Sequence, residues 1–284
     1  ERVAVLRGNA ALQHPQASRL RNLAAWIAEH TGASIGEFGE GGNAVGAQLV
    51  GALPGEGGLD AGAMLSQPMK ALLLLGVEPT LDAANAAAAA NALAGGGLVV
   101  AMTAFQDAAA DVADVMLPVA PFTETAGSFV NAEGRVQSFH GVVKPLGETR
   151  PGWKVLRVLG NLLGLPGFEQ ESAEDVRAEA LGDVSTLAQR LDNAPAAAAG
   201  AAAAAAGGSL ERVADVPIYA TDSLVRRAPA LQRTADARAP MAGLSSALWQ
   251  RLGLQPGDRV RVRQGEAEAV LPAREDASLA ERAV

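Results

Sequence analysis

The side chains best suited to chemistry gather in one stretch of an otherwise alanine- and glycine-rich sequence, residues 110–137. Two carboxylates, an amide and a guanidinium fall close together there, at Glu124, Asn131, Glu133 and Arg135. This set suits either hydrogen bonding to a polar ligand or mutual ion pairing across a turn. No nucleophile with a neighbouring base accompanies it, and the nearest histidine is His140. We therefore expect a structural clasp and no catalytic residue, with contact to a polar ligand as the alternative.

Gly134 divides this stretch into two short segments with apolar alternation, residues 128–130 and 136–139. Such a pattern around a glycine is typical of a β-hairpin, because glycine readily adopts the positive φ that a tight turn needs. Across this turn we expect Arg135 to form an ion pair with one of the clasp glutamates.

The composition excludes several kinds of site. The 284 residues include no cysteine, so disulfides, thiol nucleophiles and thiolate-bound iron–sulfur clusters are impossible within the chain. The three histidines, at 14, 30 and 140, are far apart, and we expect no metal site and no cofactor bound in this segment. A net charge of −8 argues against a nucleic-acid partner, which requires a basic surface.

The polar stretch must be positioned by the elements that precede it. Apolar runs predict buried strands at residues 3–6, 71–75, 98–102 and 112–117. Helical patterns occur at residues 15–30, 81–93, 107–111 and 151–163. Because continuous apolar strands that alternate with helices form parallel sheets, the sequence predicts an α/β fold with a parallel sheet flanked by helices on both faces.

The chain is expected to have three parts. Residues 1–165 form the α/β domain, and residues 166–210 a helical and alanine-rich linker. Residues 211–284 hold a short helix and an alternating hairpin at 259–271. No apolar run has the roughly 20 residues of a membrane-spanning helix. The chain starts at Glu1 and stops without a closing element, which we interpret as a fragment of a longer protein.

A glycine-rich segment, residues 36–46, loosely has the spacing of a phosphate-binding loop. It lacks the Lys-Ser/Thr pair of such loops, and Glu37 and Glu40 would repel phosphate. An irregular packed loop is the preferred interpretation, and an independent nucleotide-binding module is an alternative hypothesis.

The polar stretch resembles the signature of the molybdopterin oxidoreductase superfamily. The resemblance rests on residues 113–118, Glu124, residues 127–131 and 133–137, and on Pro145–Trp153 with the helix that follows. The strand at 71–75 with Gly76 is similar in order and spacing. Residues 243–258 resemble the start of the superfamily's C-terminal barrel domain, which implies that residues 211–284 are an incomplete β-barrel domain.

Within the superfamily, the chain is most similar to the large iron–sulfur subunit of bacterial NADH-quinone oxidoreductase, or respiratory complex I. The similarity includes residues 105–107, residues 130–137 and the alanine-rich linker. It implies a scaffold without catalysis of its own, iron–sulfur clusters in a missing N-terminal part, and molybdopterin binding as unlikely. It also implies the other peripheral-arm subunits of complex I as partners, at the cytoplasmic side of the bacterial inner membrane.

The resemblance leaves a second hypothesis open, a fragment of a true molybdenum-dependent enzyme such as a nitrate reductase or formate dehydrogenase. Such an enzyme would bind pterin guanine dinucleotides, partly through the loops near Gly76–Thr80 and Met102–Asp107.

Overall fold

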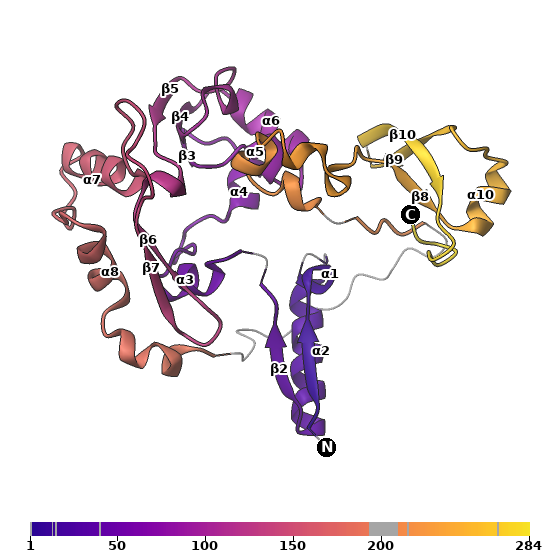
Figure 1. The fold of residues 1–284 in the computed structure, drawn as a ribbon, viewed down its shortest axis with the longest axis horizontal. Helices are drawn as coiled ribbons and strands as arrows, with labels where there is room; N and C mark the ends of the chain where they lie inside the picture. The colour runs from indigo at the N-terminus through magenta and orange to yellow at the C-terminus, as the bar shows by residue number, and fades with distance from the viewer. Residues whose placement is uncertain are drawn as a thin grey trace. The chain divides into compact units, whose positions relative to one another are not determined.

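The computed structural model describes residues 2–12, 14, 16–39, 41–192, 210–214, 216–265 and 267–284. The chain divides into two compact units, residues 1–197 and 198–284 (Figure 1). The alanine-rich part of the expected linker, residues 193–208, lies outside the described residues, as do Pro15, Glu40 and Glu266.

The N-terminal unit begins with a β–α–β segment. Its two strands, β1 (Ala4–Arg7) and β2 (Ser34–Glu37), pair in parallel, and α1 (Asn9–Leu12) and α2 (Ala17–Thr31) connect them. An ion pair joins the strand ends, from Arg7 to Glu37. Because residues 36 and 37 belong to β2, the glycine-rich segment begins in a strand rather than in an irregular loop.

The main sheet has three parallel strands in the order β3-β4-β5, with bounds Ala71–Leu75, Leu98–Thr103 and Val115–Pro118. Helices α5 (Pro79–Asp82) and α6 (Ala86–Ala94) follow β3, and the 3-10 turn η1 (Gln106–Ala108) follows β4. The predicted α/β fold with a parallel sheet is confirmed, although the helix expected at 107–111 is only this short turn.

The two faces of the main sheet differ in burial. On one face Leu74, Val99 and Ala101 form a core with Leu93 of α6 and with Ala109. On the other face the edge strands leave three side chains 44–48% exposed, those of Leu73, Leu75 and Val115. The expected cover on both faces is therefore complete on one face only, because α6 and the chain after β4 pack on the same side.

The single helix expected over residues 81–93 is divided in two. Ala83 has extended dihedral angles, φ −84° and ψ 142°, which end α5. Asn85 then starts α6, because its side-chain oxygen accepts a hydrogen bond from the backbone N–H of Ala88 at 3.0 Å. Asparagine stabilises helix starts in this way and interrupts helices elsewhere, which explains the break.

A β-hairpin and two helices complete the unit. The hairpin consists of β6 (Gly127–Val130) and β7 (Val136–Phe139). Helices α7 (Gly152–Leu162) and α8 (Ala173–Leu181) and the 3-10 helix η3 (Val184–Arg190) follow it. Two further helices lie between β2 and β3, namely α3 (Ala44–Leu49) and α4 (Ala61–Ser66). The 3-10 turn η2 (Phe122–Glu124) lies between β5 and β6. A second core unites the hairpin with α8 and η3 through Val130, Leu181 and Leu187. Residues 173–190, which the sequence assigned to a linker, therefore pack on the hairpin.

The C-terminal unit contains a small mixed sheet. Strand β10 (Ala267–Glu275) pairs antiparallel with β9 (Arg259–Gln264) and parallel with β8 (Ala242–Leu244). Helix α10 (Ser246–Leu252) packs against it, and short helices precede it, namely η4 (Ile218–Ala220), α9 (Ser223–Arg226), η5 (Leu231–Arg233) and η6 (Ala235–Ala237). The predicted hairpin is confirmed. In the described residues its sheet is open and three-stranded, so the barrel domain is not confirmed.

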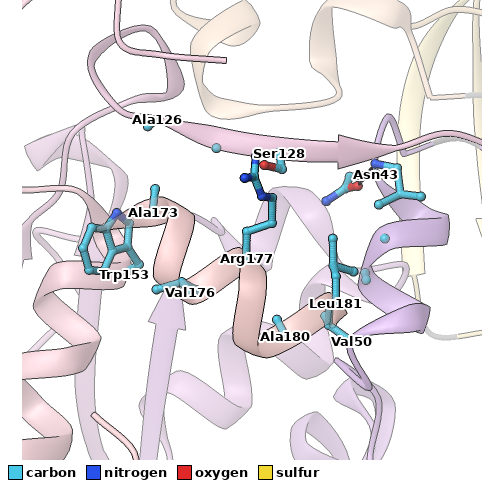
Figure 2. Close-up of a pocket in the computed structure, with 14 residues that line it drawn as sticks. Asn43, Val50, Ala126, Ser128, Trp153, Ala173, Val176, Arg177, Ala180 and Leu181 are labelled. Atoms are coloured by element: carbon cyan, nitrogen blue, oxygen red, sulfur yellow. Dashed lines mark hydrogen bonds between the residues drawn. The ribbon is translucent and has the colours of Figure 1, made fainter. Parts of the chain in front are cut away.

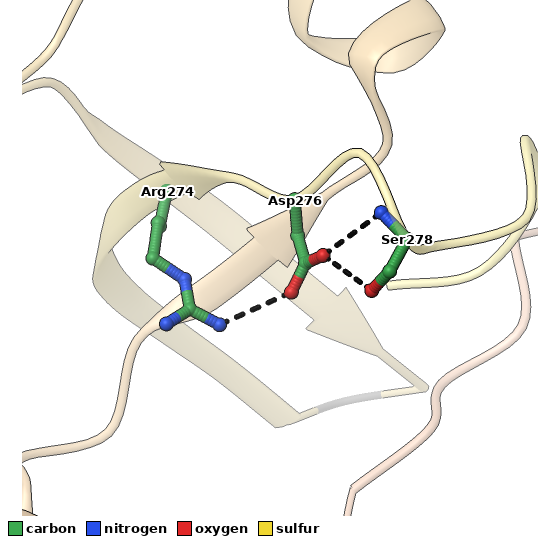
Figure 3. Close-up of polar contacts among 3 residues, drawn as sticks. All are labelled: Arg274, Asp276 and Ser278. Atoms are coloured by element: carbon green, nitrogen blue, oxygen red, sulfur yellow. Dashed lines mark hydrogen bonds and ion pairs between the residues drawn. The ribbon is translucent and has the colours of Figure 1, made fainter.

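The turn after β10 is held by Asp276 (Figure 3). Its carboxylate accepts hydrogen bonds from the hydroxyl and backbone N–H of Ser278, at 2.6 and 3.1 Å, and contacts Arg274 at 3.2 Å. The Ser278 hydroxyl, then its backbone N–H and the Arg274 charge, lower the pKa of Asp276. An aspartate used in this way is a structural feature of the turn.

The helices in the described part of the chain are all too short or too polar to cross a lipid bilayer.

Candidate functional site

The turn of the β6–β7 hairpin is organised by Asn131. Its side-chain oxygen accepts hydrogen bonds from the backbone N–H groups of Glu133 and Arg135, at 3.0 and 2.9 Å. Gly134 has a φ of +80°, as the turn requires, and is buried. The hairpin and the role of its glycine, both predicted from the sequence, are confirmed.

Glu124 acts at a different place. Its carboxylate accepts a hydrogen bond from the backbone N–H of Leu146 at 2.9 Å, which joins η2 to the segment before α7. In the described part of the chain no ion pair links Arg135 to Glu124 or Glu133, so the expected pair is not formed. The physical reason is that the donors needing acceptors in this turn are backbone N–H groups, which Asn131 satisfies, while the Arg135 side chain is exposed to water.

Alanine substitutions can distinguish the structural role of Asn131 from that of Arg135. We expect Asn131→Ala to lower the free energy of unfolding by about 1–2 kcal/mol, because two backbone N–H groups lose their acceptor. Arg135→Ala should change it by less than about 0.5 kcal/mol, as is usual for an exposed side chain. Urea denaturation of both variants measures the difference. A loss for Arg135→Ala as large as that for Asn131→Ala would contradict this assignment.

The carboxyl ends of β3 and β4 form the edge at which parallel α/β sheets usually bind ligands. Gly76 follows β3 with a φ of +62°, donates its N–H to the carbonyl of Met102 at 2.9 Å, and has open space where a Cβ would stand. Beyond it, the Asp82 carboxylate accepts the backbone N–H of Glu78 at 2.6 Å. Asp107 lies in η1, after β4.

This edge is acidic. Glu78, Asp82 and Asp107 lie in the two loops that follow β3 and β4, and residues 76–82 and 103–109 include no lysine or arginine. Glu78 is only 5% exposed. Carboxylates accept hydrogen bonds from N–H and O–H groups and repel phosphate, so the loops favour a ligand that presents donors.

The glycine-rich segment 36–46 runs from the end of β2 into the first turn of α3, closer to the arrangement of a phosphate loop than its sequence suggested. The side-chain oxygen of Asn43 in this segment accepts a hydrogen bond from the backbone N–H of Val130 in the hairpin at 2.8 Å. A Cβ on Gly46 would lie 2.2 Å from that oxygen. The end of the segment is therefore packed against the hairpin, and Glu40 lies outside the described residues.

One residue of structural importance had no role assigned from the sequence. Asp114 lies just before β5, and its carboxylate accepts the backbone N–H of Val99 in β4 at 2.8 Å. Its own N–H donates to the Val99 carbonyl at 2.9 Å. The sequence signal that could have indicated this role is an aspartate immediately before an apolar strand. Across the described ranges, histidine, aspartate and glutamate side chains do not gather into any group of three that could hold a metal ion.

Comparisons with known proteins give the affiliation of the chain. The family model described as "Molybdopterin oxidoreductase" matches residues 1–162. A solved structure of acetylene hydratase from Pelobacter acetylenicus is similar with a TM-score of 0.51, over 78% of this chain and 38% of that one. Because the two are 17% identical, this similarity concerns the fold alone.

Shorter stretches are similar to curated proteins. A probable oxidoreductase of Bacillus subtilis (strain 168), YjgC, is 40% identical over 76 residues, which is 27% of this chain and 8% of the relative. A putative formate dehydrogenase of Staphylococcus aureus (strain bovine RF122 / ET3-1), SAB2186c, is 46% identical over 55 residues, or 19% of this chain and 6% of the relative. The matched stretches are thus less than a tenth of either relative. Since the family model covers more than half of the chain, the protein belongs to the molybdopterin oxidoreductase family.

Proposed function

We propose that this chain is a section of a molybdopterin-dependent oxidoreductase of the formate dehydrogenase type. The observation that carries the proposal is the family match over residues 1–162, together with the similarity to a putative formate dehydrogenase. In such an enzyme the chain would supply the parallel sheet β3–β5 and the loops at its carboxyl edge. When bound, the pterin-held metal supplies the two-electron redox centre, and the protein supplies binding and orientation.

The edge fits one end of a pterin guanine dinucleotide. Guanine and ribose present N–H and O–H donors, and the loops after β3 and β4 carry carboxylates, the groups that accept such donors. The open space at Gly76 allows close approach to the backbone. The diphosphate does not fit these loops, because they contain carboxylates and no cation. We therefore place the nucleoside end of the cofactor at this edge and assign its phosphates to residues elsewhere in the enzyme.

A second candidate is the cofactor-free scaffold of the large iron–sulfur subunit of NADH-quinone oxidoreductase. The acidic edge without lysine or arginine favours it, since a scaffold needs no phosphate site. Under this candidate the partners are other peripheral-arm subunits of complex I, and the place is the cytoplasmic face of the bacterial inner membrane. Electron transfer would then belong to iron–sulfur clusters bound by another part of the protein.

Metal analysis of the full-length protein decides between the two. We expect about one molybdenum or tungsten atom per polypeptide in protein purified from a host that makes the pterin cofactor. Iron without molybdenum or tungsten, together with NADH–quinone activity of the assembled complex, would replace the first candidate by the second.

A matched pair of variants tests the edge itself. Asp107→Ala should lower the metal content of the full-length protein, because a guanosine acceptor is removed. Asp111→Ala is the control, since it removes an exposed carboxylate a few residues away. Equal metal content in both variants would exclude Asp107 from the site.

A further inference from the structure

An open cavity of about 260 Å³ lies in the N-terminal unit (Figure 2). Residues of α3, β6, α8 and the first turn of α7 line it. Trp153 stands at one side, and α8 forms a long wall. No residue named so far as a candidate ligand of the pterin cofactor contributes to this lining.

The sequence of α8 explains why the cavity exists. Its lining residues recur at helical spacing, as Ala173, Val176, Arg177, Ala180 and Leu181, so one stripe of the helix faces the space. The alanines in this stripe are too small to fill it. The facing walls are also built from small residues, including Gly46 and Ala47 of α3 and Ala126 and Ser128 at β6. An apolar hollow follows from these small residues.

One cation belongs to this apolar lining. The guanidinium of Arg177 donates a hydrogen bond to the hydroxyl of Ser138 at 2.6 Å, and that hydroxyl lies 2.8 Å from the hydroxyl of Ser128. Figure 2 shows Arg177 and Ser128 close together at the cavity. Among the described residues no carboxylate forms an ion pair with Arg177. A half-buried guanidinium that donates to one hydroxyl, that of Ser138, retains donors for an anion.

Two of the three acidic residues of α8 are engaged elsewhere, and the third, Glu174, is exposed and forms no ion pair with Arg177 among the described residues. Asp175 accepts the backbone N–H of Ser172 at 2.9 Å as part of the cap that begins the helix. Glu179 accepts a hydrogen bond from the side chain of Gln170. A second cation stands near the other side of the cavity, because Lys154 lies 5.3 Å from the centre of the Trp153 ring. Among the residues that line the apolar space, the charged side chain is that of Arg177.

We propose that this cavity is a binding site for a small apolar monocarboxylate, a short alkyl or single-ring acid. The carboxylate pairs with Arg177, and the hydroxyls of Ser128 and Ser138 hold the guanidinium in place. The apolar part lies against Val176, Ala180 and the ring of Trp153. The volume of about 260 Å³ is just below the roughly 300–1,000 Å³ of small-molecule pockets, which favours a small acid over a cofactor.

Octanoate is a suitable probe, and its neutral isostere octanamide is the matched ligand. Calorimetry with the full-length protein should show saturable octanoate binding with a Kd on the order of 0.1–1 mM. Octanamide should bind at least about tenfold more weakly, because it cannot form the charged pair with Arg177. Equal affinity for the two ligands would overturn the proposal. An absence of saturation in the millimolar range would overturn it too, including the case in which another part of the protein fills the cavity.

Two variants with controls locate the binding. Arg177→Gln should weaken octanoate binding at least about tenfold and leave octanamide binding unchanged. Ala180→Phe should abolish binding of both, because the ring fills the cavity. Arg251→Gln, at an exposed arginine of the C-terminal unit, and Ala178→Phe, at an exposed position of α8 outside the lining, should bind octanoate as the parent does. Unchanged binding in Arg177→Gln would show that the acid binds elsewhere.

Discussion

Replacement of Gly134 by alanine is expected to destabilise the N-terminal unit by about 2–5 kcal/mol. Gly134 has a φ of +80°, a conformation that costs an L-residue roughly 1–2 kcal/mol. A Cβ at this position would also lie 2.8 Å from the backbone nitrogen and 2.9 Å from the Cα of Ala188. Backbone atoms cannot rotate away as a side chain does, so η3 would have to shift, at a further cost of about 1–3 kcal/mol.

Gly147→Ala provides the matched control. This glycine lies in the same unit with a φ of +57°, and apart from its chain neighbours no atom lies within 4 Å of the position of its Cβ. The control therefore carries the backbone cost alone, roughly 1–2 kcal/mol. Urea denaturation followed by circular dichroism measures both losses. Equal losses for the two variants would show that the contact with η3 contributes nothing to stability.

Leu187→Ala is expected to cost about 2–5 kcal/mol, the usual range for truncating a fully buried leucine. Leu187 is 0% exposed and packs with Val130 of β6 and Leu181 of α8. Its removal leaves a hollow between the hairpin and the two helical segments. The loss should appear as a lower urea midpoint with an unchanged slope, since the same surface is exposed on unfolding.

Leu162→Ala is the comparison, at a leucine in α7 that is 80% exposed. Its truncation should change stability by less than about 0.5 kcal/mol. If Leu187→Ala has an effect no larger than this, then η3 is not part of the cooperative core. Because Leu181 belongs both to this core and to the lining of the cavity, the core also holds one wall of the proposed acid site.

The clasp was inferred from residue types alone, and the structure gives its members separate partners. Glu124, Asn131, Glu133 and Arg135 are close along the chain, which suggested that their side chains meet. In the structure Glu124 binds the backbone of Leu146, whereas Asn131 binds the turn. Residue types give the capacity to hydrogen-bond, whereas the partner depends on which segment lies nearby.

Local signals determined the elements that the sequence predicted correctly. Continuous apolar runs suffice for β3 and β4, because such runs of four to eight residues next to glycine are typical of strands in parallel sheets. Gly134 suffices for the β6–β7 turn, because its conformation is a property of the residue itself. The polar alternation of β9 and β10 likewise predicts an antiparallel hairpin without knowledge of the rest of the chain.

Only the tertiary structure decided which distant groups meet. The pairing of β2 with β1, the bond from Val130 to Asn43 and the bond from Arg177 to Ser138 join residues 30, 87 and 39 positions apart. Periodicity along the chain contains no information about such partners, because they are selected by how helices and strands pack. The cavity at Arg177 likewise depends on tertiary structure. Its small residues are evident in the sequence, but the empty volume between them exists only once α3, β6, α7 and α8 pack together.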